Sequence, residues 1–112
     1  MSAFAIGSVL RNEVVKGVRI VVAEITGTAS YDTNGSSLAL SSYFSSKVYG
    51  GKVLSVSAHA SDRYSLSVVK ASSYGLSPTI KVRDLAAVTP GSEASSTTDL
   101  SAITWVMEFV GV

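Results

Sequence analysis

The chain has 112 residues, of which 46% are hydrophobic and only 15% are charged, with a formal net charge of +1. Soluble domains usually carry about 25% charged residues, so this composition predicts apolar surface that another molecule must cover, and a homo-oligomer is the first hypothesis. The alternative is a monomer with a compact core and a serine-coated exterior. The nine basic residues are scattered along the chain, which argues against nucleic-acid binding.

Other features of the composition narrow the protein class. The absence of cysteine excludes disulfides and thiolate chemistry. No apolar run approaches the roughly 20 residues of a membrane span, and no basic segment precedes the apolar stretch after Met1, so we expect neither a membrane partner nor a signal peptide. The length suits a single β domain over residues 1–112.

The first segment, residues 1–11, precedes the first clear strand pattern and is predicted to be an extended N-terminal arm. Nothing in its spacing commits its apolar side chains to the domain's own sheet, so they are the first candidates for an assembly interface. These residues are Phe4, Ile6, Val9 and Leu10.

The stretch 14–31 reads as a strand in which Val18, Ile20 and Val22 share a face. Glu24 would follow them into the core, so we expect a β-bulge near Ala23 that redirects the strand. The next segment, 32–36, resembles the opening of a calcium loop but lacks the ligands that complete one. Its Asn-Gly pair predicts a tight turn instead.

Alternating apolar residues predict half-buried strands at 53–60 and 63–71, joined as a hairpin at Asp62-Arg63. The same alternation places Ile80 and Val82 on one face of a later strand. The residues expected to face inward in the first two strands are Leu54, Val56, Ala58, Ala60, Tyr64, Leu66 and Val68.

Residues 103–112 form a strand pattern that is apolar on both faces. Such a strand must be covered on both sides, so we expect it inside a sheet or against a neighbouring subunit, with Asp99 in the turn that aims it. Trp105 is assigned to the core. Three further residues of this segment join the candidate interface: Met107, Phe109 and Val112. Together, the elements predict an all-β fold, either an antiparallel β-sandwich or a small jelly-roll-like barrel.

Few residues point to chemistry. The one histidine, His59, falls on the serine face of its strand, and no G-x-S-x-G motif singles out a serine. We therefore expect no enzyme, no metal site and no cofactor. A carbohydrate- or receptor-binding β-module of a phage fibre or tail is the alternative function, because tyrosines near predicted turns can serve as binding platforms. These are Tyr31, Tyr43, Tyr49, Tyr64 and Tyr74.

Three stretches, in chain order, carry a family resemblance. The first is Ile25-Thr26-Gly27-Thr28-Ala29-Ser30-Tyr31-Asp32-Thr33-Asn34-Gly35-Ser36-Ser37-Leu38, the second is the set of alternating strands, and the third is Thr98-Asp99-Leu100-Ser101-Ala102-Ile103 with the apolar strand after it. From about Arg19 onward the chain resembles the small capsid decoration, cement or minor head proteins of tailed bacteriophages, through turn chemistry and patterning.

The resemblance implies a virion structural protein. It would be made in the host bacterial cytoplasm, bind the major capsid protein on the outer face of an assembled head and stabilise that head, as a homotrimer. These are expectations from the resemblance, and composition and spacing do not establish them.

Overall fold

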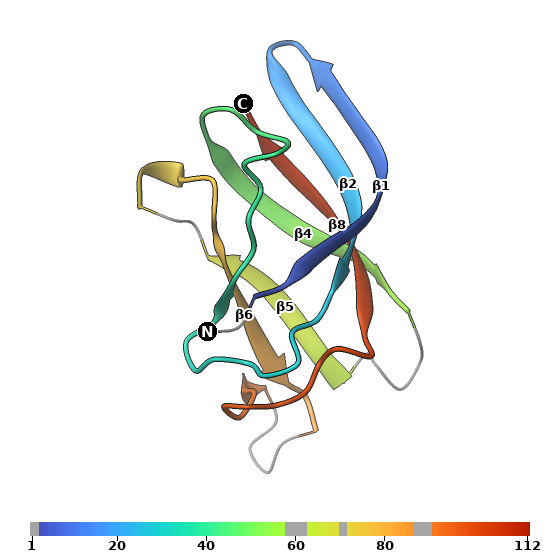
Figure 1. Cartoon of the computed structure of the whole chain (residues 1–112), viewed down its shortest axis with the longest axis vertical. Helices are drawn as coiled ribbons and strands as arrows, with labels where there is room; N and C mark the ends of the chain where they lie inside the picture. The colour runs from blue at the N-terminus through green and yellow to red at the C-terminus, as the bar shows by residue number, and fades with distance from the viewer. Residues whose placement is uncertain (1–2, 58–62, 70–71, 87–90) are drawn as a thin grey trace.

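The computed structural model describes residues 3–57, 63–69, 72–86 and 91–112. Two sheets with antiparallel pairing between their strands make up the fold (Figure 1). The first has the order β1-β2-β8-β4, with β1 at Ala5–Val15, β2 at Val18–Thr26, β8 at Thr104–Gly111 and β4 at Val48–Val56. The second has the order β3-β6-β5, with β3 at Ser36–Ser37, β6 at Thr79–Asp84 and β5 at Tyr64–Val69. Two short elements complete it: β7, Ser92–Glu93, pairs with β6, and η2, Ser72–Tyr74, is a 3₁₀ turn.

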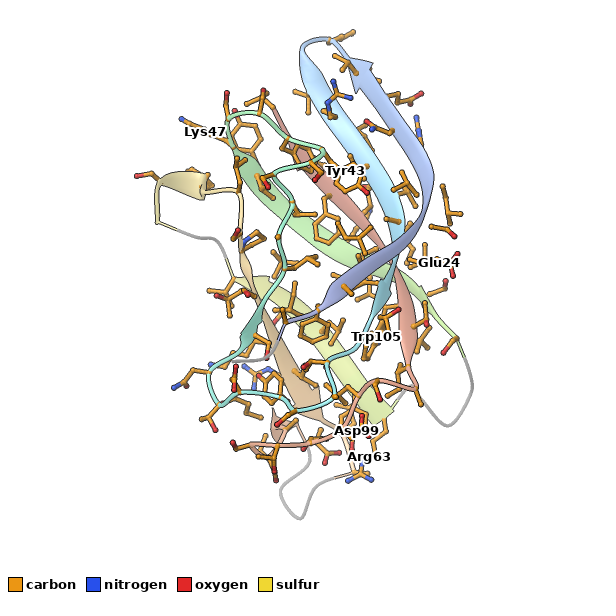
Figure 2. The ribbon with its side chains drawn as sticks, in the orientation of Figure 1. Glu24, Tyr43, Lys47, Arg63, Asp99 and Trp105 are labelled. Atoms are coloured by element: carbon orange, nitrogen blue, oxygen red, sulfur yellow. The ribbon has the colours of Figure 1, made fainter. Side chains whose placement is uncertain are left out.

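The all-β fold class is confirmed, and β8 lies at the centre of the first sheet. It pairs with β2 on one side and β4 on the other, as expected for a strand inserted into a sheet. Its residues Trp105, Met107 and Phe109 are buried, and Figure 2 shows Trp105 inside the molecule. The backbone carbonyl of Val112 accepts hydrogen bonds from the amides of Ser46 and Lys47, at 2.8 and 3.0 Å. The end of β8 is thus held to the loop before β4.

The expected bulge near Ala23 is wrong for β2, because the two register shifts that flank the Val9–Ala23 pair place their extra residues in β1. The pairing of β2 with β8 runs without a register shift from Arg19 to Thr26. Val21, Ala23 and Ile25 form the buried face, while Ile20, Val22 and Glu24 lie half-buried on the other. Both faces of this strand are apolar along most of its length, so alternation alone assigned the wrong face to the core.

The expected hairpin over residues 53–71 is also wrong, because β4 and β5 belong to different sheets. A register shift between Val53 and Ser55 leaves Leu54 49% exposed, whereas Val53 and Val56 pack on the core. In β5 the inward residues are as predicted, since Tyr64, Leu66 and Val68 pack against the core. His59 and Asp62, together with Ala58 and Ala60, lie outside the described residues.

The extended N-terminal arm is not confirmed. Residues 5–15 form β1 and pair with β2, and Ala3 makes an isolated bridge to Ser37 of the second sheet. Phe4 is buried in the core. Two register shifts, between Ile6 and Val9 and between Val9 and Arg11, interrupt the ladder. These irregularities break the alternation that would have marked the segment as a strand.

Two predicted turns are confirmed. Asn34 and Gly35 both have positive φ, at 72° and 115°, and the Gly35 amide donates to the carbonyl of Asp32. The Asp99 carboxylate accepts hydrogen bonds from the backbone amide and the hydroxyl of Ser101, at 2.9 and 2.6 Å. These bonds hold the corner immediately before β8 and lower the pKa of Asp99.

Candidate assembly surface

The hairpin of β1 and β2 projects at one end of the long axis of the molecule (Figure 1). Its loop has only two residues, because Val15 pairs directly with Val18. Lys16 and Gly17 both have positive φ, at 52° and 82°. This combination is that of a type I′ turn, whose twist matches that of the two strands it joins. The turn therefore fixes the register of the hairpin.

Strand β1 is the edge of the first sheet, and among the described strands it pairs with β2 alone. Ten of its eleven residues are exposed. An edge strand presents unpaired N–H and C=O groups, which natural proteins usually protect with bulges, charges or prolines. Both bulges of β1 lie before Arg11, and the stretch from Arg11 to Val15 pairs with β2 in unbroken register. That stretch is a regular template for another strand.

The exposed side chains of β1 are unusually apolar for a surface strand. Val9 and Leu10 are 36% and 58% exposed, and Val14 and Val15 are 57% and 44% exposed. They lie within one short edge strand, on both of its faces, and a group of exposed apolar residues, unlike a single one, indicates a contact surface. We name the segment from Val9 to Val15 the β1 edge.

Two opposite charges lie in the middle of the β1 edge. The guanidinium of Arg11 is paired with the carboxylate of Glu13, two residues along the same strand. Nearby, Nη1 of Arg19 donates to Oδ1 of Asn12 at 2.7 Å. Exposed pairs of this kind contribute little to stability. They do give the edge a defined charge pattern, positive then negative.

A second surface feature lies at the opposite edge of the same sheet. Residues of β4 and β8 line a hollow of about 370 Å³: Tyr49, Gly50, Gly51, Lys52, Glu108 and Val110. Across it, Nζ of Lys52 lies 3.9 Å from Oε1 of Glu108. The ring of Tyr49 is 46% exposed and packs edge to face on Tyr74, with centroids 5.7 Å apart. The hollow is apolar and is bordered by an aromatic ring and an ion pair.

The structure divides the predicted interface residues into three groups. Phe4, Met107 and Phe109 are buried in the core of the chain itself. Ile6 and Val112 are half-buried, and Val9 and Leu10 are exposed on β1. Sequence reasoning missed the rest of the β1 edge, namely Arg11, Asn12, Glu13, Val14 and Val15. The Lys16-Gly17 pair between β-branched residues was the signal for this hairpin.

The described residues include no group of three or more His, Cys, Asp or Glu side chains placed to hold a metal ion. Among the same residues, no helix is long and apolar enough to cross a membrane.

Comparison of the chain with protein families, with curated proteins and with solved structures finds no match.

Proposed function

We propose that this protein is a virion structural protein, a capsid decoration protein that binds the outer face of an assembled phage head and stabilises it as a homo-oligomer. The observation that supports an assembling protein is the β1 edge, a regular edge strand with exposed apolar side chains on a projecting hairpin. The virion context comes from the sequence resemblance, which also implies a trimer; the β1 edge supports self-association and does not set the number of copies.

The mechanism requires binding and no bond chemistry. A protein that binds the assembled lattice and not the free capsid subunits stabilises the lattice by mass action. Each contact can be weak, because many copies on one head, linked to one another, bind with greater collective strength. A small sandwich with one face for its own copies and another for the capsid meets these requirements.

The test uses particles assembled from the phage or prophage genome that encodes the chain. We expect mass spectrometry of purified heads to find the protein in many copies per head. Heads that lack it should rupture at lower temperature, and adding the purified protein back should restore the wild-type rupture temperature. Absence of the protein from purified particles would contradict the proposal.

The hollow beside Tyr49 supports a second candidate, a carbohydrate-binding module of a fibre or tail. Sugars stack on exposed aromatic rings, and Lys52 and Glu108 at the hollow can bond hydroxyl groups. The test is binding to a glycan array, in which Tyr49→Ala should abolish binding. Val69→Ala, also at an exposed apolar residue, is the matched control. Recovery of the protein in isolated tails, and not in heads, would favour this candidate.

A further inference from the structure

We propose that two copies of the chain pair through β1, antiparallel and across a two-fold axis at Asn12. The two four-stranded sheets would then continue into one another. This inference rests on the self-association in the proposed function and needs no capsid. It names the partner, a second copy of this chain, and the register in which it binds.

The backbone of β1 presents the groups that this pairing needs. In an antiparallel ladder, every second residue directs its N–H and C=O groups toward the neighbouring strand. The two residues that flank a two-residue hairpin loop form such a hydrogen-bonded pair. Val15 flanks the loop, so Val15, Glu13 and Arg11 direct their backbone groups toward β2. Asn12 and Val14 direct theirs to the free edge. An axis at Asn12 brings these outward groups of the two copies together.

The side chains of the β1 edge are complementary to themselves in this register. Arg11 lies opposite Glu13 of the second copy, and the axis repeats this pair. At each end of the regular stretch, Leu10, which lies in the β1 bulge between Val9 and Arg11, comes near Val14 of the second copy, and this apolar contact is repeated as well. Opposite charges and apolar pairs directly across an antiparallel ladder are stabilising. Each copy thus supplies both halves of every contact.

Neighbouring registers lack this complementarity. An axis at Arg11 sets two arginines opposite each other, and an axis at Glu13 sets two glutamates opposite each other, which is unfavourable. A shift by a single residue turns each side chain to the face opposite its partner. Among these registers, the one with the two-fold axis at Asn12 is therefore the one in which opposite charges face each other.

The other edge of the first sheet is a weaker candidate. Strand β4 carries two register shifts, between Val48 and Gly50 and between Val53 and Ser55. It also lies beside β5 of the second sheet (Figure 1). Bulges and a covering strand are the usual protection of a sheet edge. Over Arg11–Val15, strand β1 has no bulge, and no strand in the described part of the chain covers its outer edge.

The register is tested by disulfide cross-linking, which suits a chain without cysteine. In the proposed pair, Arg11 and Glu13 of the second copy form a non-hydrogen-bonded pair with Cα atoms about 4.5 Å apart, within the range of about 4.4–6.8 Å for a disulfide. Arg11→Cys protein mixed with Glu13→Cys protein, one of them mass-tagged, should give the mixed dimer on mild oxidation. Either variant alone should cross-link at least about ten-fold less. Ser41→Cys, at an exposed residue in the loop between β3 and β4, is the control for random collision.

The charges are tested without cross-linking, by sedimentation velocity over a range of protein concentrations. A single strand pair is small beside a standard interface of about 1,600 Å², so we expect a dimer that dissociates on dilution. Arg11→Glu should weaken the dimer at least ten-fold, and Arg11→Glu/Glu13→Arg should restore it, with circular dichroism and thermal unfolding confirming that each variant folds.

Several results would overturn the pairing: a monomer at every concentration, a trimer unaffected by Arg11→Glu, self-links as abundant as the mixed link, or no rescue by the double exchange. None of them decides whether the chain binds phage heads, which its presence in purified heads tests separately; a monomer at every concentration would also contradict the homo-oligomer of the proposed function. A dimer with the mixed link in a protein absent from heads would leave the pairing intact and refute the decoration function.

Discussion

The ring of Phe4 packs edge to face against the indole of Trp105, with centroids 6.2 Å apart and ring planes at 61°. Both side chains are buried, and the Phe4 amide donates to the carbonyl of Ser37 at 2.9 Å. The segment that leads into β1 is therefore anchored between the two sheets. This anchor holds the start of strand β1, while the Lys16-Gly17 turn holds its end.

The Phe4 anchor predicts a large loss of stability in Phe4→Ala. Removing a buried phenylalanine side chain costs about 3–5 kcal/mol in free energy of unfolding, through lost burial and the cavity that remains. Urea denaturation of dilute protein measures this cost. Leu10→Ala, at a residue that is 58% exposed, is the control and should change the free energy of unfolding by less than about 0.5 kcal/mol. Equal stability of the two variants would mean that Phe4 belongs to a free arm.

Tyr31→Phe should destabilise the protein through one buried hydrogen-bond relay. The Tyr31 hydroxyl donates to Oε2 of Glu93 at 2.6 Å and accepts from the amide of Val82 at 3.0 Å. The phenylalanine leaves the Val82 amide without its partner in the core, at a cost of about 1–3 kcal/mol. Tyr49→Phe, at an exposed ring, should leave the free energy of unfolding unchanged within error.

The hydrogen bonds of the Tyr31 hydroxyl also predict how the free energy of unfolding changes at alkaline pH. Burial, with the bond to Glu93 as a further cause, raises the pKa of Tyr31 to about 12. The unfolded chain loses this proton near pH 10, so Tyr31 contributes stability that is full below about pH 10 and is lost as the pH rises toward 12. Wild-type stability should therefore fall more steeply over this range than that of Tyr31→Phe. A phenolate absorbance titration that counts all five tyrosines as ionised in folded protein at pH 10.5 would contradict this assignment.

Gly27→Ala should disrupt the crossing between the end of β2 and the loop before β8. A Cβ atom at Gly27 would lie 2.1 Å from the carbonyl oxygen of Leu100, which is backbone and cannot turn aside. Overpacking of this kind costs about 1–3 kcal/mol or more. Gly50→Ala is the matched control, because a Cβ there has no neighbour within 4 Å; it should be neutral or stabilise by up to about 1 kcal/mol. Thermal unfolding of the two variants gives the comparison, and similar losses would contradict the close approach.

The sequence was sufficient for local features. Alternation identified the inward residues of β5, the assignment of Trp105 to the core was correct, and the Asn34-Gly35 pair marked a real turn. These features depend on residues close together in the chain, where period-2 patterning and positive φ are informative. The all-β class followed from them.

Long-range features were not accessible in the same way. Nothing in the local pattern says that β4 pairs with β8 and β5 with β6, because strand partners are chosen by the packing of the whole core. Apolar side chains on both faces of β2 hid its orientation. Phe4 and Leu10 show why the sequence could not identify the interface residues. Both are large and apolar and lie in one short segment, yet Phe4 is 4% exposed and Leu10 is 58% exposed. Composition does not separate a core residue from a contact residue.

The ion pair at the end of the molecule remote from the hairpin predicts how stability falls in acid (Figure 2). Nε and Nη2 of Arg63 donate to the two carboxylate oxygens of Asp84, at 2.7 and 2.8 Å, and the Ala86 amide donates to Oδ1. These bonds, that of Arg63 first, lower the pKa of Asp84 below its usual range.

A lowered pKa in the folded state means that the unfolded chain takes up the Asp84 proton first as the pH falls. The contribution of Asp84 is therefore present above its unfolded pKa of about 3.9 and is lost as the pH falls through the folded value. In Asp84→Asn that part of the acid dependence disappears, so urea midpoints measured from about pH 7 down to pH 2 should decline less steeply than in wild type. Arg63→Gln keeps the carboxylate but removes the main cause of its lowered pKa, so it should flatten the decline in the same direction. An Arg63→Gln profile as steep as that of wild type would show that the guanidinium does not set the pKa of Asp84.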